Sequence, residues 1–208
     1  MARYTGSACK LCRSEQEKLF LKGQRCNVKC ALDTKRGKNP PGKKAGSRMR
    51  KASEYAVRLR EKQKAKRLYG LTEQQFSNFF VRAAKLDGLT GDNLLQLLEL
   101  RLDNVVYRLG MAPSRRFARQ IVNHGHVLVN GKRVSLPGYP LKQNDTIALS
   151  EKMKISESLK RSMEQTGKTP AWLKLDATTA SGAVLSVPRP DECSHPINSQ
   201  LIVELYSK

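Results

Sequence analysis

The chain has 208 residues, of which 39% are hydrophobic, and a formal net charge of +21. This length allows a buried core and favours one or two domains. The sequence contains no run of about 18 apolar residues, and its start lacks the apolar core of a signal peptide. We therefore expect a soluble, cytoplasmic protein that has no membrane partner.

The positive charge is concentrated in the first third of the chain. Residues 1–70 contain 21 Lys and Arg against 5 Asp and Glu, whereas residues 71–208 contain 18 against 13. A local excess of this kind attracts phosphate backbones, although it does not read sequence by itself. The N-terminal third is therefore predicted to bind a polyanion.

Residues 1–32 carry four of the five cysteines at C-x2-C-x13-C-x3-C spacing, namely Cys9, Cys12, Cys26 and Cys30. Four thiolates in two close pairs can enclose a zinc ion tetrahedrally. An iron–sulfur cluster also takes four thiolates, and four buried free thiols are the alternative without a metal. We predict a structural zinc site that forms a small knuckle, because a saturated site leaves no position for a substrate.

Residues 33–52 are predicted to form an extended basic arm. Within them, residues 34–51 hold eight basic side chains, no acidic ones and a Pro-Pro-Gly break. Such a segment lacks the apolar residues needed to collapse alone. We expect it to be ordered mainly by its partner.

A basic helix is predicted to follow the arm, with Ser53 as its N-cap and Gly70 at its end. Its six cations are offset by only two acidic residues of the same helix. This imbalance favours RNA contact over a solvated face. The cations are Arg58, Arg60, Lys62, Lys64, Lys66 and Arg67.

Residues 53–98 are predicted to form a helical domain. A second helix begins at a capping box made by Thr72 and Gln75, and its phenylalanines recur at the spacing of a core face. Residues 94–109 are apolar over too wide an arc for an exposed helix. They are predicted to form a central helix, closed by Gly110.

Residues 99–165 are predicted to form a small α+β module, with two helices packed on a short antiparallel sheet. Ser114 is the N-cap of the second helix. A tight hairpin follows, because Asn130-Gly131 supplies the two positive-φ residues of a type I′ turn.

Further elements are predicted beyond the hairpin. Short strands are expected at 139–141 and 146–149, and a polar helix is expected at 151–168. Residues 166–208 are predicted to return to the helical domain, which makes the module an insertion. The predicted fold class is therefore α+β, with a metal knuckle, a basic arm and a mostly helical first domain.

Five segments together resemble the S4 family of bacterial small-subunit ribosomal proteins. In family order, they read MARY, SEYAVRLREKQKAKRLYG, LLELRLDNVVYRLG, SRRFARQIVNHGHVLVNGKRV and LIVELYSK. The resemblance covers nearly the whole chain. It implies a protein without catalytic activity that binds 16S rRNA directly and nucleates assembly of the body of the small subunit. It also implies contact with ribosomal protein S5, a place near the mRNA entry path and a contribution to translational accuracy.

The resemblance also implies which residues contact RNA. On the basic helix and in the module, the implied rRNA contacts are Arg58, Lys62, Lys66, Arg67, Arg115, Arg116, Arg119, His124, Asn130 and Lys132. Near incoming mRNA, the implied positions are Arg48, Arg50 and Lys51. The four clustered cysteines mark a zinc-binding subtype of the family.

Other functions are less well supported by the residues. Arg101-Leu102-Asp103 resembles a triplet with a catalytic Asp in some pseudouridine synthases, but an RNA-modifying enzyme needs a separate catalytic domain of about 100 residues. Asp103 is instead predicted to be a buried partner of an arginine. A zinc-dependent DNA-binding regulator would need a recognition helix beside the cysteines. Binding of mRNA or polymerase outside the ribosome stays open, no small-molecule substrate is expected, and Cys193 is interpreted as an incidental thiol.

Overall fold

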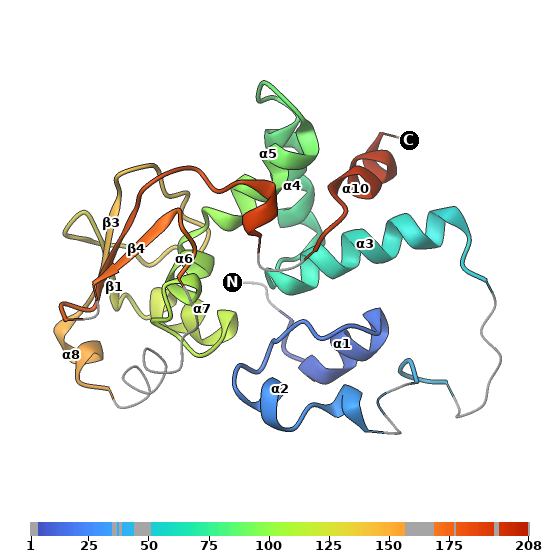
Figure 1. The fold of residues 1–208 in the computed structure, drawn as a ribbon, viewed down its shortest axis with the longest axis horizontal. Coiled ribbons are helices and arrows are strands. Elements are labelled where there is room, and N and C mark those ends of the chain that lie inside the picture. The colour runs from blue at the N-terminus through green and yellow to red at the C-terminus, as the bar shows by residue number, and fades with distance from the viewer. Residues whose placement is uncertain are drawn as a thin grey trace. The chain divides into compact units, whose positions relative to one another are not determined.

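A computed structural model describes residues 4–34, 37, 39–43, 51–156, 169–176, 178–193 and 196–207. The chain divides into two compact units (Figure 1). Unit 1 comprises Met1–Leu94 and His195–Lys208, and unit 2 comprises Leu95–Ser194. Helix α5 (Thr90–Glu99) crosses this division.

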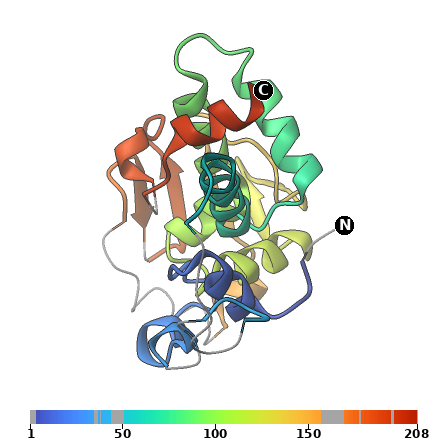
Figure 2. The ribbon, with the colours of Figure 1, turned by 90° about the vertical axis from the view of Figure 1, so that its right-hand side faces the viewer.

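Unit 1 is helical throughout its described elements. These are α1 (Ala8–Glu15), α2 (Arg25–Val28), the 3-10 helix η1 (Ala31–Asp33), α3 (Glu54–Leu68), α4 (Glu73–Ala83), the start of α5, and α10 (Ser199–Tyr206). The C-terminal helix α10 packs against α3, so the two chain segments that make up unit 1 are in contact (Figures 1 and 2).

The predicted helix starts of unit 1 are confirmed. Ser53 is the N-cap of α3, and its side chain accepts a hydrogen bond from the backbone of Ala56. Thr72 and Gln75 form the reciprocal capping box of α4. Because these side chains satisfy the first free N–H groups, both helices begin where the sequence indicates.

Aromatic packing connects α10 to the core of unit 1. The Tyr206 ring stacks on Phe80 with centroids 4.4 Å apart, and Phe76 is fully buried beneath them. Phe80 itself is only partly buried. The aromatic face of α4 is therefore a core face, as predicted, and the C-terminal helix covers it.

Unit 2 combines helices with a five-stranded antiparallel sheet. Its helices are α6 (Leu102–Arg108), α7 (Arg115–Asn123), α8 (Glu151–Lys154) and the 3-10 helix η2 (Pro190–Glu192). Its strands, in sheet order, are β2 (Lys132–Arg133), β1 (Val127–Val129), β3 (Thr146–Leu149), β5 (Ser181–Val184) and β4 (Leu173–Asp176). The core lies between the sheet and the apolar sides of α6 and α7. The mixed helical and antiparallel fold class is thus confirmed.

The prediction of a single central helix over 94–109 is wrong. The segment forms two helices, α5 and α6, because the backbone between them is extended at Arg101, with φ −68° and ψ 137°. The N–H of Leu141 donates to the carbonyl of Leu100 at 2.9 Å, and Arg101 forms an isolated bridge to Pro140. The strand expected at 139–141 is only this bridge, and the distant pairing breaks the helix.

The segment predicted to return to the helical domain at residue 166 does so later. Strands β4 and β5 extend the sheet of unit 2 beyond β3, and Ile147 faces Gly182 in that register. The physical reason is apolar burial, since Trp172 and Val184 are fully buried in the same core. Of the helix predicted over 151–168, only α8 lies within the described residues before position 157.

Candidate nucleic-acid interface and cysteine cluster

The hairpin between β1 and β2 is held by the side chain of Asn130. Asn130 and Gly131 have φ values of 49° and 77°, as the type I′ turn requires. The Asn130 amide donates to Asp145 at 2.8 Å, and its oxygen accepts from the backbone N–H of Thr146 at 2.9 Å. The Asn130 side chain therefore links the turn to the start of β3, although Asn130 is exposed at the tip of the hairpin.

Exposed basic groups lie on α7 and on the adjoining hairpin. They are Arg116, His124, Lys132 and Arg133. Arg133 was missed by sequence reasoning, although it follows Lys132 directly. Its guanidinium donates to the carbonyl of His124 at 3.0 Å, so it bridges the end of α7 and the hairpin. The positively charged guanidinium group of Arg133 therefore lies beside the C-terminus of α7.

Gly125 makes this bridge possible. It has φ 70°, which ends α7 in the left-handed region, and a Cβ at this position would overlap the Arg133 guanidinium. His126 lies just beyond and its ring is 3.4 Å from the hydroxyl of Ser150. The two histidines therefore differ, because His124 is exposed and His126 is partly buried.

Arg115 and Arg119, which the resemblance implies to be rRNA contacts, do not lie on the exposed side of α7. They are only 9% and 7% exposed. Arg115 Nε donates to Asn104 Oδ1 at 2.8 Å, and its guanidinium lies 4.5 Å from the centroid of the Tyr107 ring. Arg119 lies 3.8 Å from a carboxylate oxygen of Asp103. The apolar residues Ala118, Ile121 and Val122 mark the inward side of α7, but the sequence of this helix does not indicate that α6 offers polar partners there.

Asp103 is the buried partner of an arginine, as predicted. Arg101 donates two hydrogen bonds to its carboxylate, Nε at 3.1 Å and Nη2 at 2.8 Å. Both residues are almost fully buried. A carboxylate held in this way is an acceptor in a structural ion pair, which is the role favoured over catalysis.

The cations of α3 are paired with acidic residues, most of which come from outside this helix. The prediction of RNA contact weighed these cations only against the two acidic residues of the same helix, whereas Glu15, Glu17, Glu73 and Glu204 lie elsewhere in the chain. The ion pairs are Arg58 with Glu54 and Glu204, Arg60 and Arg67 with Glu15, Lys62 and Lys66 with Glu73, and Lys64 with Glu17 and Glu61. The basic helix therefore ties α1, α4 and α10 together. Any phosphate that binds α3 must compete with these carboxylates.

The positions expected near mRNA are only partly described. Lys51 is exposed just before α3. Arg48 and Arg50 lie outside the described residues.

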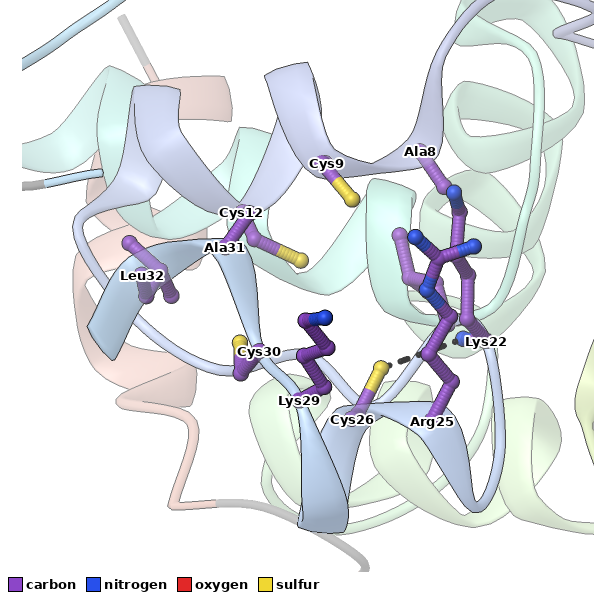
Figure 3. Close-up of a pocket in the computed structure, with 11 residues that line it drawn as sticks. Ala8, Cys9, Cys12, Lys22, Arg25, Cys26, Lys29, Cys30, Ala31 and Leu32 are labelled. Atoms are coloured by element: carbon purple, nitrogen blue, oxygen red, sulfur yellow. Dashed lines mark hydrogen bonds between the residues drawn. The ribbon is translucent and has the colours of Figure 1, made fainter. Parts of the chain in front are cut away.

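The four clustered cysteines line one pocket of unit 1 (Figure 3). Cys9 and Cys12 come from α1, Cys26 comes from α2, and Cys30 directly precedes η1. Cys26 Sγ accepts a hydrogen bond from the backbone N–H of Lys22 at 3.4 Å. The other lining residues are Ala8, Leu21, Arg25, Lys29, Ala31 and Leu32. Folding therefore brings both halves of the sequence motif to one place.

It is electrostatically unfavourable for several thiols in this pocket to be ionised at the same time. Burial raises the pKa of the Cys12 thiol, and negative charge on Cys26, Cys9 and Cys30 raises it further. A hydrogen bond from the backbone of Leu19 partly offsets these effects. A divalent cation would remove this mutual repulsion.

In the described ranges, which include all four of these cysteines, no group of three or more His, Cys, Asp or Glu side chains has the arrangement of a metal site. The chemistry of the donor set still suits a thiophilic metal, because four thiols share one pocket. None of the helices within those ranges has the length and apolar character needed to cross a membrane.

Comparison with known proteins gives matches over the whole chain. The model of the ribosomal protein S4/S9 N-terminal domain matches residues 3–99, and the S4 domain model matches residues 100–147. Three relatives are each named small ribosomal subunit protein uS4. They come from Endomicrobium trichonymphae, Acetivibrio thermocellus and Thermus thermophilus, and they are 59%, 53% and 49% identical to this chain, with 100% of both chains covered in each case.

Proposed function

The chain belongs to the uS4 family of small ribosomal subunit proteins, and we propose that it binds 16S rRNA through the exposed basic side of its S4 domain. It is a structural, rRNA-binding ribosomal protein, and its relatives are ribosomal proteins and not enzymes. The observation that carries the proposal is that Arg116, His124, Lys132 and Arg133 are all exposed on α7 and its hairpin, and that Arg133 connects the hairpin to the end of α7.

The binding mechanism is electrostatic attachment to a preformed surface. Folded RNA is recognised mainly through its backbone, its 2′-hydroxyls and its shape, so rigid placement of cations matters more than base-edge contacts. The Asn130 turn and the Arg133 bridge supply that rigidity. The arm and the α3 cations Arg58, Lys62, Lys66 and Arg67 add further phosphate contacts, in competition with their carboxylate partners.

Family membership supports a proposal about further partners. We infer that the protein is a primary binder that nucleates the body of the small subunit, contacts ribosomal protein S5 and contributes to translational accuracy. Exposed Lys51, with Arg48 and Arg50, is proposed to lie near the mRNA entry path. The protein then resides on cytoplasmic ribosomes.

The test is a titration of the full chain against a five-way-junction fragment of small-subunit rRNA, with excess unrelated folded RNA as competitor. We expect tight binding that survives competition.

Combining Arg116→Ala with Lys132→Ala should weaken binding of the rRNA fragment at least about tenfold, because phosphate contacts supply much of the affinity. The matched control is Lys174→Ala with Arg189→Ala, which removes two exposed cations of unit 2, one of them on β4 at the sheet edge opposite β2. Equal losses in the two double variants would contradict a dedicated surface.

The cysteine pocket is proposed to hold a structural zinc ion, with Cys9, Cys12, Cys26 and Cys30 as ligands. Its support is the shared pocket and the repulsion that a cation would relieve. The zinc would cross-link α1 to the segment from Cys26 to Cys30, and an iron–sulfur cluster is the competing occupant.

Metal analysis of the purified chain should give one zinc per chain without the visible absorption of a cluster. Cys26→Ser should lose the metal while Cys193→Ser retains it, and metal-free wild-type protein would refute the site.

A further inference from the structure

Arg115 and Arg119 are buried in a polar network between α6 and α7 of unit 2. Asn104 is the centre of this network, because its side chain accepts from Arg115 and donates to Glu99. The donation to the Glu99 carboxylate is 2.7 Å long, and a second one, to the Glu99 backbone carbonyl, is 2.9 Å long. Asn104 is 1% exposed and Glu99 is fully buried.

A phosphate contact by these two arginines would be costly. Each guanidinium would have to leave partners inside the protein, so a buried polar group would lose one of its contacts. For Arg115 that group is the Asn104 oxygen. For Arg119 it is the Asp103 carboxylate, which keeps its two hydrogen bonds from Arg101. A phosphate brought to the same place would also lie close to the negative charges of Asp103 and Glu99, which repel it.

The same contacts explain what the two arginines do instead. Arg115 is the first residue of α7, and its fork is fixed by Asn104 and by the face of Tyr107, both from α6. Arg119 lies one turn later and faces Asp103, also on α6. Two successive turns of α7 are thus locked to α6, which sets the direction of the intervening Arg116.

We propose that Arg115 and Arg119 serve RNA binding as positioning residues that hold α7, while the exposed cations make the phosphate contacts. This inference rests on the proposed function and refines it. An arginine is required at position 115 because a lysine keeps the charge but loses the planar fork that satisfies Asn104 and stacks on Tyr107.

The decisive variants keep the charge of the protein constant. Arg115→Lys and Asn104→Ala should each lower affinity for the rRNA fragment about tenfold. The double variant should lose less affinity than the sum of the two single losses, because either change alone breaks the contact between Arg115 and Asn104. The matched control, Arg189→Lys, makes the same change at an exposed arginine of unit 2 outside the proposed surface and should leave the affinity unchanged. Wild-type affinity of Asn104→Ala beside a tenfold loss in Arg115→Lys would overturn the proposal.

A measurement on the unaltered full chain guards against variants that do not fold. The arginine Nε–H signals of the wild-type protein are followed by nuclear magnetic resonance as the rRNA fragment is added. The Arg115 signal should resist solvent exchange before RNA is added and shift little afterwards, whereas the Arg116 and Arg133 signals should shift. A large shift of Arg115 alone would refute the positioning role. Failure of wild type to bind under competition would instead refute the proposed function itself.

Discussion

At the scale of single residues, the pair of Arg101 and Asp103 is the clearest test of buried charge. Arg101→Ala leaves the Asp103 carboxylate buried without its main partner, and we expect a loss of about 3–5 kcal/mol in the free energy of unfolding of unit 2. Urea unfolding followed by the fluorescence of Trp172, the only tryptophan, reports on this unit.

Two variants control this experiment. Lys154→Ala breaks the exposed pair with Glu151 and should cost less than about 1 kcal/mol. Arg101→Met with Asp103→Leu removes both charges and should destabilise less than Arg101→Ala does. If Arg101→Ala lowers the free energy of unfolding no more than Lys154→Ala does, the buried pair contributes no more to stability than an exposed pair.

Cys193 is a second residue with a definite chemical expectation. Burial raises its pKa to about 12, and the negative charge of Glu99 adds to this effect. At pH 8 the side chain is thus almost entirely a neutral thiol, which reacts slowly with alkylating reagents. Peptide mass spectrometry after iodoacetamide treatment should show alkylation of Cys193 far slower than that of a short cysteine peptide. Equal rates would contradict the burial of this thiol.

Sequence reasoning at this scale succeeded where the determinant is local. The Asn130-Gly131 turn and the Arg101-Asp103 pair involve near neighbours in the chain, so their spacing was informative. The burial of Arg115 and the pairing of Lys62 with Glu73 depend on which element packs opposite. Periodicity within one helix does not contain that information.

At the scale of elements, the link between α3 and α4 should respond to acid. Burial alone would raise the pKa of Glu73, but hydrogen bonds from Lys62 and Lys66 outweigh it and hold the pKa below its usual value. A carboxylate with a lowered pKa stabilises the fold above its ordinary pKa of about 4.3, and this stability is lost as the pH falls through the folded value.

The corresponding experiment compares wild type with Glu73→Gln between about pH 3 and pH 7. Wild type should be the more stable protein near pH 7, and the difference should shrink as the pH falls below about 4. Because Trp172 lies in unit 2, hydrogen exchange of the α4 amides is the suitable readout. A difference that does not change with pH would show that the Glu73 charge is not what stabilises this link.

Element boundaries were predictable where side chains cap the backbone. Ser53 and Thr72 start α3 and α4 by accepting local hydrogen bonds, and the sequence displays such caps directly. The break between α5 and α6 has no such signal. It arises because the N–H of Leu141 pairs with the carbonyl of Leu100.

At the scale of the whole molecule, the mixed helical and antiparallel fold class could be predicted from the sequence pattern, but the extent of the sheet could not. Strands β4 and β5 follow residues 157–168 in the chain, and their short apolar runs were equally compatible with either unit. Their place beside β3 depends on long-range backbone pairing of Thr146 with Ala183 and its neighbours. Trp172 then completes the core.

The net charge of +21 does not translate directly into phosphate contacts, because folding pairs much of it internally. Glu73 is the sharpest case, since one carboxylate holds both Lys62 and Lys66. If α3 lies on the rRNA, Glu73→Gln releases two cations for phosphates. The logarithm of the binding constant should then fall more steeply with the logarithm of salt concentration, by about 0.9 to 1.8 in slope.

The measurement is the affinity for the rRNA fragment at four or more salt concentrations, for wild type and for Glu73→Gln. Glu151→Gln is the matched control, because it releases Lys154 in unit 2, on a helix that is not proposed to contact RNA. Its slope should equal that of wild type. An unchanged slope for Glu73→Gln would mean that Lys62 and Lys66 do not reach phosphates. In that case α3 serves to tie α1, α4 and α10 together, and the affinity comes from the S4 domain and the arm.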